Sequence, residues 1–222
     1  MKTTMKELTS RQQQALSTKK KIRETAYALL QNEPYEQLKM SAIASAAGVS
    51  VGTLYHYYPS KEALFFSGYH EFDIMVEQLR GSFSFSSHIE AIRALIYAQI
   101  GGAILRGVNL MSIVLRLQLC SQGNLFLDHK RAFPQYILAH VSEAIDQGEL
   151  LAIDSAEEIT HTILRTARGS IFDCCARNQV DQITQIGLHD LDIVLSHYTP
   201  EPREAFPPVN PVWLEAYRKW NA

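Results

Sequence analysis

The segment that most restricts the fold lies at residues 39–64, KMSAIASAAGVSVGTLYHYYPSKEAL. Apolar residues recur at helical spacing on both sides of Gly48, which suits a tight turn because glycine adopts positive φ without steric cost. Ser50 is a favoured N-cap residue for the second of these helices, and Pro59 ends it. The order predicts two short helices joined by a turn, with a further helix beginning after Ser60.

The rest of the chain also has helical periodicity, and no useful stretch alternates apolar and polar residues. Ser87 with Glu90, and Ser155 with Glu158, have the spacing of capping boxes, while Pro134 suits the first turn of a helix. Residues 1–16 are polar and aperiodic, so we expect them to be mobile or a frayed extension of the first helix. We predict an all-α fold of nine or ten helices. The expected bounds include 17–32, 40–47, 51–58, a long fourth helix ending near 81, one ending at 148, 155–176, 181–197 and 213–220.

Charge is divided unevenly along the 222 residues, although the net charge is only −2. Residues 1–61 hold nine Lys and Arg against four Asp and Glu, whereas the remainder holds twelve against nineteen. A basic head suits a polyanionic partner, but many N-terminal segments are basic and merely solvated, so charge alone does not decide.

Composition indicates a cytoplasmic protein. No apolar run approaches the roughly 18 residues that span a bilayer, and the start has no apolar signal region. Three cysteines form an odd set without metal-site spacing, so we expect reduced thiols. We therefore expect no membrane association.

The helix expected at 51–58 has the features of a DNA recognition helix. Leu54 and Tyr58, four residues apart, can hold it against the helices behind. Gly52 permits close approach of the backbone to DNA. The side chains left for the groove and its phosphates are Thr53, Tyr55, His56 and Tyr57. The alternative is that the tyrosines are core residues, which we favour for Tyr58 only.

The run IASAAGVSVGTLYHYYPSKEAL resembles the signature of the TetR family of bacterial transcriptional regulators, over about residues 17–69. The resemblance implies an N-terminal three-helix DNA-binding domain, here 17–62 with its helix-turn-helix motif at about 39–58. It also implies a C-terminal helical ligand-binding and dimerisation domain, here 63–222. Residues carried over as DNA contacts are Ser50, Gly52, Thr53, Tyr55, His56 and Tyr57, with Lys61 as the phosphate anchor.

Two positions depart from the family pattern. Val51 stands where many members have a lysine, which removes one phosphate contact. Lys39 stands where a threonine often opens the second helix, so a side-chain cap is lost and a phosphate contact is gained. Lys19, Lys20, Lys21 and Arg23 are either a solvated face or weak phosphate contacts.

Large deformable side chains in the middle helices suggest an apolar pocket, although such stripes are more often core. Gln118 falls seven residues after Met111 and so on the apolar face of its helix, where a buried amide needs a partner. We expect an apolar or weakly polar small-molecule effector. The candidate ligand-binding residues are Phe65, Tyr69, Phe72, Tyr97, Met111, Leu115, Gln118, Phe126 and Phe133.

The resemblance further implies a homodimer through the last two long helices, because one recognition helix covers only half a site. Its expected contact stripes, parts of which must be intramolecular core, are Ile159, Ile163, Ala167 and Ile171 on one helix and Ile183, Ile186, Leu191 and Val194 on the other.

The expected function is a transcriptional repressor that a small molecule releases from operator DNA. The alternative is a helix-turn-helix interaction or DNA-binding module without ligand response. No catalytic arrangement, phosphate loop, cofactor motif or metal-ligand spacing is present in the sequence, so we expect neither an enzyme nor a cofactor.

Overall fold

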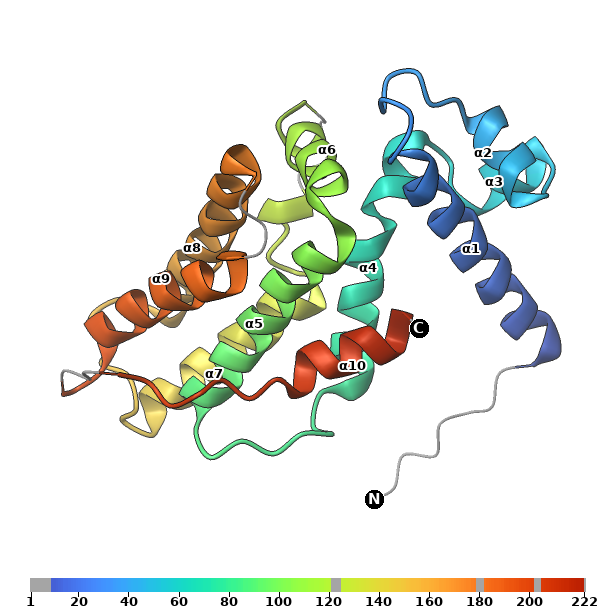
Figure 1. Ribbon diagram of the computed structural model, residues 1–222. Coiled ribbons are helices and arrows are strands. Elements are labelled where there is room, and N and C mark those ends of the chain that lie inside the picture. Colours follow the sequence, from blue (N-terminus) through green and yellow to red (C-terminus); the bar gives the residue numbers. More distant parts are fainter. Residues whose placement is uncertain (1–8, 121–124, 179–181, 202–204, 222) are drawn as a thin grey trace. The chain divides into compact units, whose positions relative to one another are not determined.

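The computed structural model describes residues 9–120, 125–178, 182–201 and 205–221, and all regular structure within these ranges is helical (Figure 1). The chain divides into two compact units, Met1–Ser67 and Gly68–Ala222. The all-α prediction is confirmed. The elements are α1 (Ser10–Leu29), α2 (Met40–Ala47), α3 (Val51–Tyr57), α4 (Lys61–Leu79), α5 (His88–Arg106), α6 (Val108–Cys120), the 3₁₀ helix η1 (Leu125–Leu127), α7 (Ala132–Asp146), α8 (Ala156–Arg177), α9 (Ile183–Tyr198) and α10 (Val212–Asn221).

The N-terminal unit is built from α1, α2, α3 and the first turns of α4, in which the unit boundary falls. Its fully buried side chains include Ile22, Ile43 and Leu54, one from each of the first three helices. Helix α1 begins seven residues earlier than expected, at Ser10. The reason is that Arg11 and the residues after it favour helix by propensity, whereas no apolar stripe marks this stretch as helical.

The second unit is arranged around α5, which contacts α7, α9 and α10 (Figure 1). Almost every face of α5 is buried, as expected for a helix that is apolar all round. Helix α10 lies against two glycines of α5: a Cβ on Gly101 would come within 2.8 Å of both terminal methyl groups of Leu214. The two glycines, Gly101 and Gly102, therefore allow this close packing.

One buried ion pair links α5, α9 and the C-terminal segment. Arg93, only 5% exposed, donates to both carboxylate oxygens of Asp192 at 2.7 and 3.0 Å and to the carbonyl of Pro207 at 2.6 Å. Removing one partner of such a pair leaves a buried charge uncompensated.

The capping predictions hold at the N-cap itself. The hydroxyls of Ser87 and Ser155 accept hydrogen bonds from the amides of Glu90 and Glu158. In the first capping box the Glu90 carboxylate would be expected to accept from the amide of the N-cap residue Ser87. It accepts instead from the amide and hydroxyl of Ser86. The expected start of the last long helix at Asp181 lies outside the described residues, and α9 is described from Ile183.

The expected dimer stripes are wrong in part. Ile159, Ile163, Ala167 and Ile171 are at most 4% exposed within a single chain, as are Ile183 and Leu191. Helical periodicity identified the face of each helix that packs inside the protomer, because that face is the most apolar. Among the large apolar side chains described on α8 and α9, Phe172 and Ile193 remain exposed, at 57% and 59%.

Candidate functional site

The turn between α2 and α3 is held by the backbone. Gly48 has φ of 67°, the left-handed region that favours glycine. This conformation lets the amide of Val49 donate to the carbonyl of Ala44 at 3.0 Å, which ends α2. Ser50 then caps α3, its hydroxyl accepting from the amide of Thr53 at 3.0 Å. Local chemistry alone therefore sets where each helix of the motif begins and ends.

Helix α3 is fixed by two buried side chains, as expected. Leu54 is 0% and Tyr58 is 2% exposed. The Tyr58 hydroxyl donates to the carbonyl of Lys19 on α1 at 3.0 Å, and burial is the main reason that the pKa of Tyr58 is raised to about 12. The phenol thus remains a neutral hydrogen-bond donor that ties α3 to α1.

The opposite face of α3 is open. Gly52, Tyr55 and His56 are exposed, with Tyr55 at 47%, while Thr53 and Tyr57 are half-buried. His56 and Tyr57 lie edge to face, with ring centroids 5.3 Å apart. Hydroxyl, phenol and imidazole groups on one short face suit hydrogen bonding to base edges and phosphates.

A shallow groove of about 550 Å³ lies beside this face, lined by Lys39, Val51, Tyr55 and Lys61 among others. Lys39 is exposed and occupies the N-cap position of α2 without a side-chain cap. The Lys61 ammonium donates to the carbonyls of Tyr35 at 2.6 Å and Leu38 at 3.0 Å. Because an ammonium has three N–H groups, one remains for a phosphate. Lys61 is thus both a brace for the loop before α2 and a candidate anchor.

Of the basic residues on α1, Arg23 is only 5% exposed, so it belongs to the interior of the N-terminal unit and not to a solvated face.

The candidate ligand-binding residues fall into three places. Phe65 lies in the N-terminal unit, where it is 1% exposed and its ring lies 6.0 and 5.3 Å from those of Tyr27 and Tyr35. We therefore drop Phe65 from the ligand-binding set, since it is core there. Tyr97 and Leu115 are half-buried in the second unit.

The remaining candidates form two neighbouring clusters in the second unit. In the first, the Tyr69 hydroxyl donates to the sulfur of Met111 at 3.7 Å, and the rings of Tyr69 and Phe126 lie 5.3 Å apart. Gln118 is buried, as expected, and its Oε1 accepts from the amide of Phe126 at 2.9 Å. The second cluster joins Phe72 with Phe133, whose ring centroids lie 5.2 Å apart.

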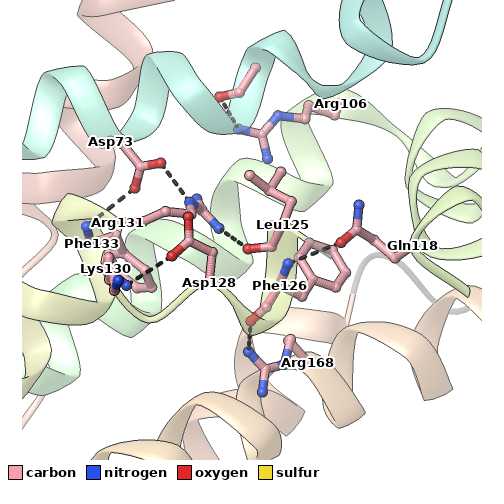
Figure 2. Close-up of polar contacts among 11 residues, drawn as sticks. Asp73, Arg106, Gln118, Leu125, Phe126, Asp128, Lys130, Arg131, Phe133 and Arg168 are labelled. Carbon is pink, nitrogen blue, oxygen red and sulfur yellow. Dashed lines mark hydrogen bonds and ion pairs between the residues drawn. The ribbon is translucent and has the colours of Figure 1, made fainter. Parts of the chain in front are cut away.

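Three arginines around these clusters escaped the sequence interpretation (Figure 2). Arg131 pairs with Asp73 at 2.7 Å and donates to the carbonyl of Leu125 at 3.0 Å. Arg106 donates to the carbonyl of Gly68 at 3.2 Å and lies over the Tyr69 ring at 4.8 Å.

The third arginine, Arg168 of α8, donates to the carbonyl of Phe126 at 2.8 Å. Burial, followed by repulsion from Arg165 and Arg131, lowers its pKa from the usual value. The segment 125–131 is therefore held by Arg168 from α8 and by Arg131 from its own end.

Histidines far apart in sequence also meet. The Nδ1 atoms of His88 and His140 lie 3.0 Å apart beside a pocket of about 260 Å³. Burial, and then the proximity of His88, lowers the pKa of His140 to about 4. His129 and His161 stack with centroids 4.0 Å apart. Across the described ranges, however, no three His, Cys, Asp or Glu side chains converge as metal ligands.

No single helix in the described part of the chain is long and apolar enough to cross a membrane. Helices α5 and α6 meet the criteria of length and composition only together, and they are bent by 112° relative to each other.

The turn, the capped recognition helix and its outward polar face define a helix-turn-helix DNA-binding domain. Residues 22–67 match the family model described as bacterial regulatory proteins, tetR family. These residues therefore form a DNA-binding domain of the tetR type. Members of this family are transcriptional regulators and not enzymes.

Solved structures share the fold over most of the chain. A gamma-butyrolactone receptor (ArpA-like protein) is 18% identical, with a TM-score of 0.58, covering 94% of this chain and 98% of that one. Thermus thermophilus FadR, a TetR family transcriptional repressor in complex with lauroyl-CoA, is 23% identical, with a TM-score of 0.60 and coverage of 86% and 100%. A SmeT–triclosan complex is 17% identical, with a TM-score of 0.62 and the same coverage. A search of curated proteins finds no significant match.

Proposed function

We propose that this regulator is a cytoplasmic homodimeric repressor that binds operator DNA and is released by a small-molecule effector. The observation that carries the proposal is the outward face of α3, which presents Tyr55 and His56 to solvent while Leu54 holds the helix from behind. The proposed division assigns DNA binding to residues 17–62 and effector binding and dimerisation to 63–222.

The DNA contacts that we propose have different tasks. Thr53, Tyr55, His56 and Tyr57 contact base edges and the flanking backbone, and Gly52 allows the α3 backbone to approach closely. The phosphate contacts come from Lys39, Ser50 and Lys61, at the starts of α2, α3 and α4.

We propose dimerisation through the outer faces of α8 and α9. Phe172 and Ile193 are large apolar side chains that a single chain leaves mostly exposed. Gly169, one turn before Phe172, has nothing within 4 Å of the position of a Cβ, so a partner helix can approach closely there. Two copies are needed because one recognition helix covers about half a site.

Ligand response is supported by the cluster of Tyr69, Met111, Gln118 and the half-buried Phe126, of which Tyr69 lies on α4. An effector that prefers one arrangement of α4 changes the affinity for DNA by the ratio of its affinities for the two arrangements. FadR and SmeT are fold relatives solved with lauroyl-CoA and triclosan, which is consistent with such a response.

The test begins with selection of bound duplexes from a random pool, which supplies an operator. Tyr55→Ala should then weaken operator binding at least about fivefold without loss of helix content, since a good base contact is worth about 1–3 kcal/mol. Lys39→Gln should weaken binding to all duplexes and reduce the log–log salt slope by about 0.9. Leu16→Ala is the control, because Leu16 is 54% exposed on α1 away from the motif. Unaltered affinity in both test variants would remove the assignment.

A further inference from the structure

Phe126 lies among the three arginines Arg106, Arg131 and Arg168, and three contacts hold it in place (Figure 2). Its ring packs edge to face on Tyr69, its amide donates to Gln118 at 2.9 Å, and its carbonyl accepts from Arg168 at 2.8 Å. From carbonyl carbon to phenyl ring, this residue has the skeleton of 3-phenylpropanoic acid. The protein thus holds, within its own chain, the outline of a small aryl-substituted acid.

The arginines near Phe126 differ in how their charge is compensated. Arg131 has the Asp73 carboxylate at 2.7 Å. Within the described residues, by contrast, Arg168 contacts no carboxylate, and its hydrogen bond goes to a neutral carbonyl. A half-buried guanidinium binds a carboxylate more strongly than an amide carbonyl, because the bonds become charge-assisted and two can form side by side.

Hydrogen-bonding capacity is also left unused at this place. Gln118 is 5% exposed, and its Nε2 has no hydrogen-bond partner among the residues that the structure describes. Rotation of the amide exchanges its two polar atoms, so Gln118 can donate to an acceptor that replaces the Phe126 peptide. Nδ1 of His129, three residues beyond Phe126, is likewise buried with no partner in the described part of the chain. Burial is the main reason that the pKa of His129 is lowered, so the ring is neutral and can donate one N–H.

We propose that the effector is a small carboxylic acid with an aromatic body, which displaces the Leu125–Leu127 turn and pairs its carboxylate with Arg168. This inference rests on the proposed function, since it names the effector class of the same interior site. It replaces the expectation of an apolar or weakly polar effector.

Binding is an exchange of like groups. The ring of the acid takes the place of the Phe126 ring on Tyr69, and its carboxylate takes the place of the Phe126 carbonyl at Arg168. Gln118 and His129 supply further donors to the second carboxylate oxygen. The gain over the resident turn is the neutralised charge of Arg168, so affinity depends on the charge of the ligand more than on its shape.

The first test compares three probes of nearly equal size on the full chain by titration calorimetry: 3-phenylpropanoate, 3-phenylpropanamide and 3-phenylpropan-1-ol. The acid is expected to bind at least tenfold more tightly than either neutral probe. Equal affinities, or no binding of the acid, would overturn the proposal.

Two matched pairs of variants locate the site. Arg168→Gln should abolish the preference for the acid, whereas Arg165→Gln, an exposed arginine on the same helix, should retain it. Phe126→Ala should tighten binding of the acid severalfold by removing the resident ring, whereas Leu127→Ala should not. Where Arg168→Gln does not fold, the Phe126 and Leu127 variants decide the question. An acid preference that survives in folded Arg168→Gln contradicts the assignment, and so does equal binding of the acid by Phe126→Ala and Leu127→Ala.

Operator affinity measured with and without the acid distinguishes failure of this inference from failure of the proposed function. If the acid binds through Arg168 but operator affinity is unchanged, the inference stands and the proposed ligand response fails. If operator binding responds to metabolite extracts while the acid probe is not preferred, the ligand response stands and the inference fails.

Discussion

Truncation of Phe172 to alanine tests the proposed dimer most directly. About 57% of this side chain is exposed in one protomer, and alanine removes all of it beyond Cβ without disturbing the core. For a side chain of about 200 Å² this exposure is roughly 110 Å², of which we take about 75 Å² as covered by the partner protomer. At about 25 cal/mol per Å² this corresponds to about 2 kcal/mol per protomer.

A two-fold interface contains each residue twice, so the cost to the dimer is about 4 kcal/mol. Since each 1.4 kcal/mol is a factor of ten, the dimer dissociation constant should rise by about a thousandfold. Operator binding should weaken in parallel, because half-sites then bind separately.

Sedimentation equilibrium over a range of protein concentrations measures this change. Leu16→Ala is the control, because Leu16 is 54% exposed but lies on α1 in the N-terminal unit. If the Phe172 variant dimerises as tightly as the Leu16 variant, α8 does not provide the interface and the reasoning from exposure is refuted.

Three further substitutions have defined outcomes. Val51→Lys, at a 42% exposed position in the groove beside Lys39, should add a phosphate contact; the salt slope should steepen by about 0.9, so the variant loses about 3.5-fold more affinity between 50 and 200 mM salt, and an unchanged slope contradicts this. The folded-state pKa of His140, about 4, lies below the ordinary 6.5, so stability is complete above pH 6.5 and falls as pH decreases toward 4. The loss is about 2 kcal/mol after discounting for partial exposure of the ring, and urea titrations at pH 7 and 4.5 should show a smaller loss for His140→Gln. Gly101→Ala places a methyl within 2.8 Å of Leu214 and should cost about 1–3 kcal/mol, which an unchanged urea midpoint would disprove.

Features set by neighbours in the sequence were predictable. The caps at Ser50, Ser87 and Ser155, and the turn at Gly48, depend on contacts within five residues, so short motifs contain the required information. The same holds for the orientation of α3, because Leu54 and Tyr58 lie one turn apart and must share a face.

Features that depend on distant partners were not. Arg131 meets Asp73 from 58 positions away, and Arg168 meets Phe126 from 42, so no local pattern indicates that the arginines surround one segment. Phe65 was misassigned for a related reason. An aromatic residue on an apolar stripe shows that a face is buried but not which core it enters.

Because Phe126 already occupies the proposed site, any effector must bind there more strongly than this residue does. A group tethered to the protein competes at an effective concentration in the millimolar range or above, and no dilution removes it. Apparent affinity is therefore reduced by the fraction of molecules in which the turn has left its place. Compounds that merely imitate the resident peptide gain nothing by replacing it, so background metabolites of similar shape are ignored and only a ligand with an added charge is detected.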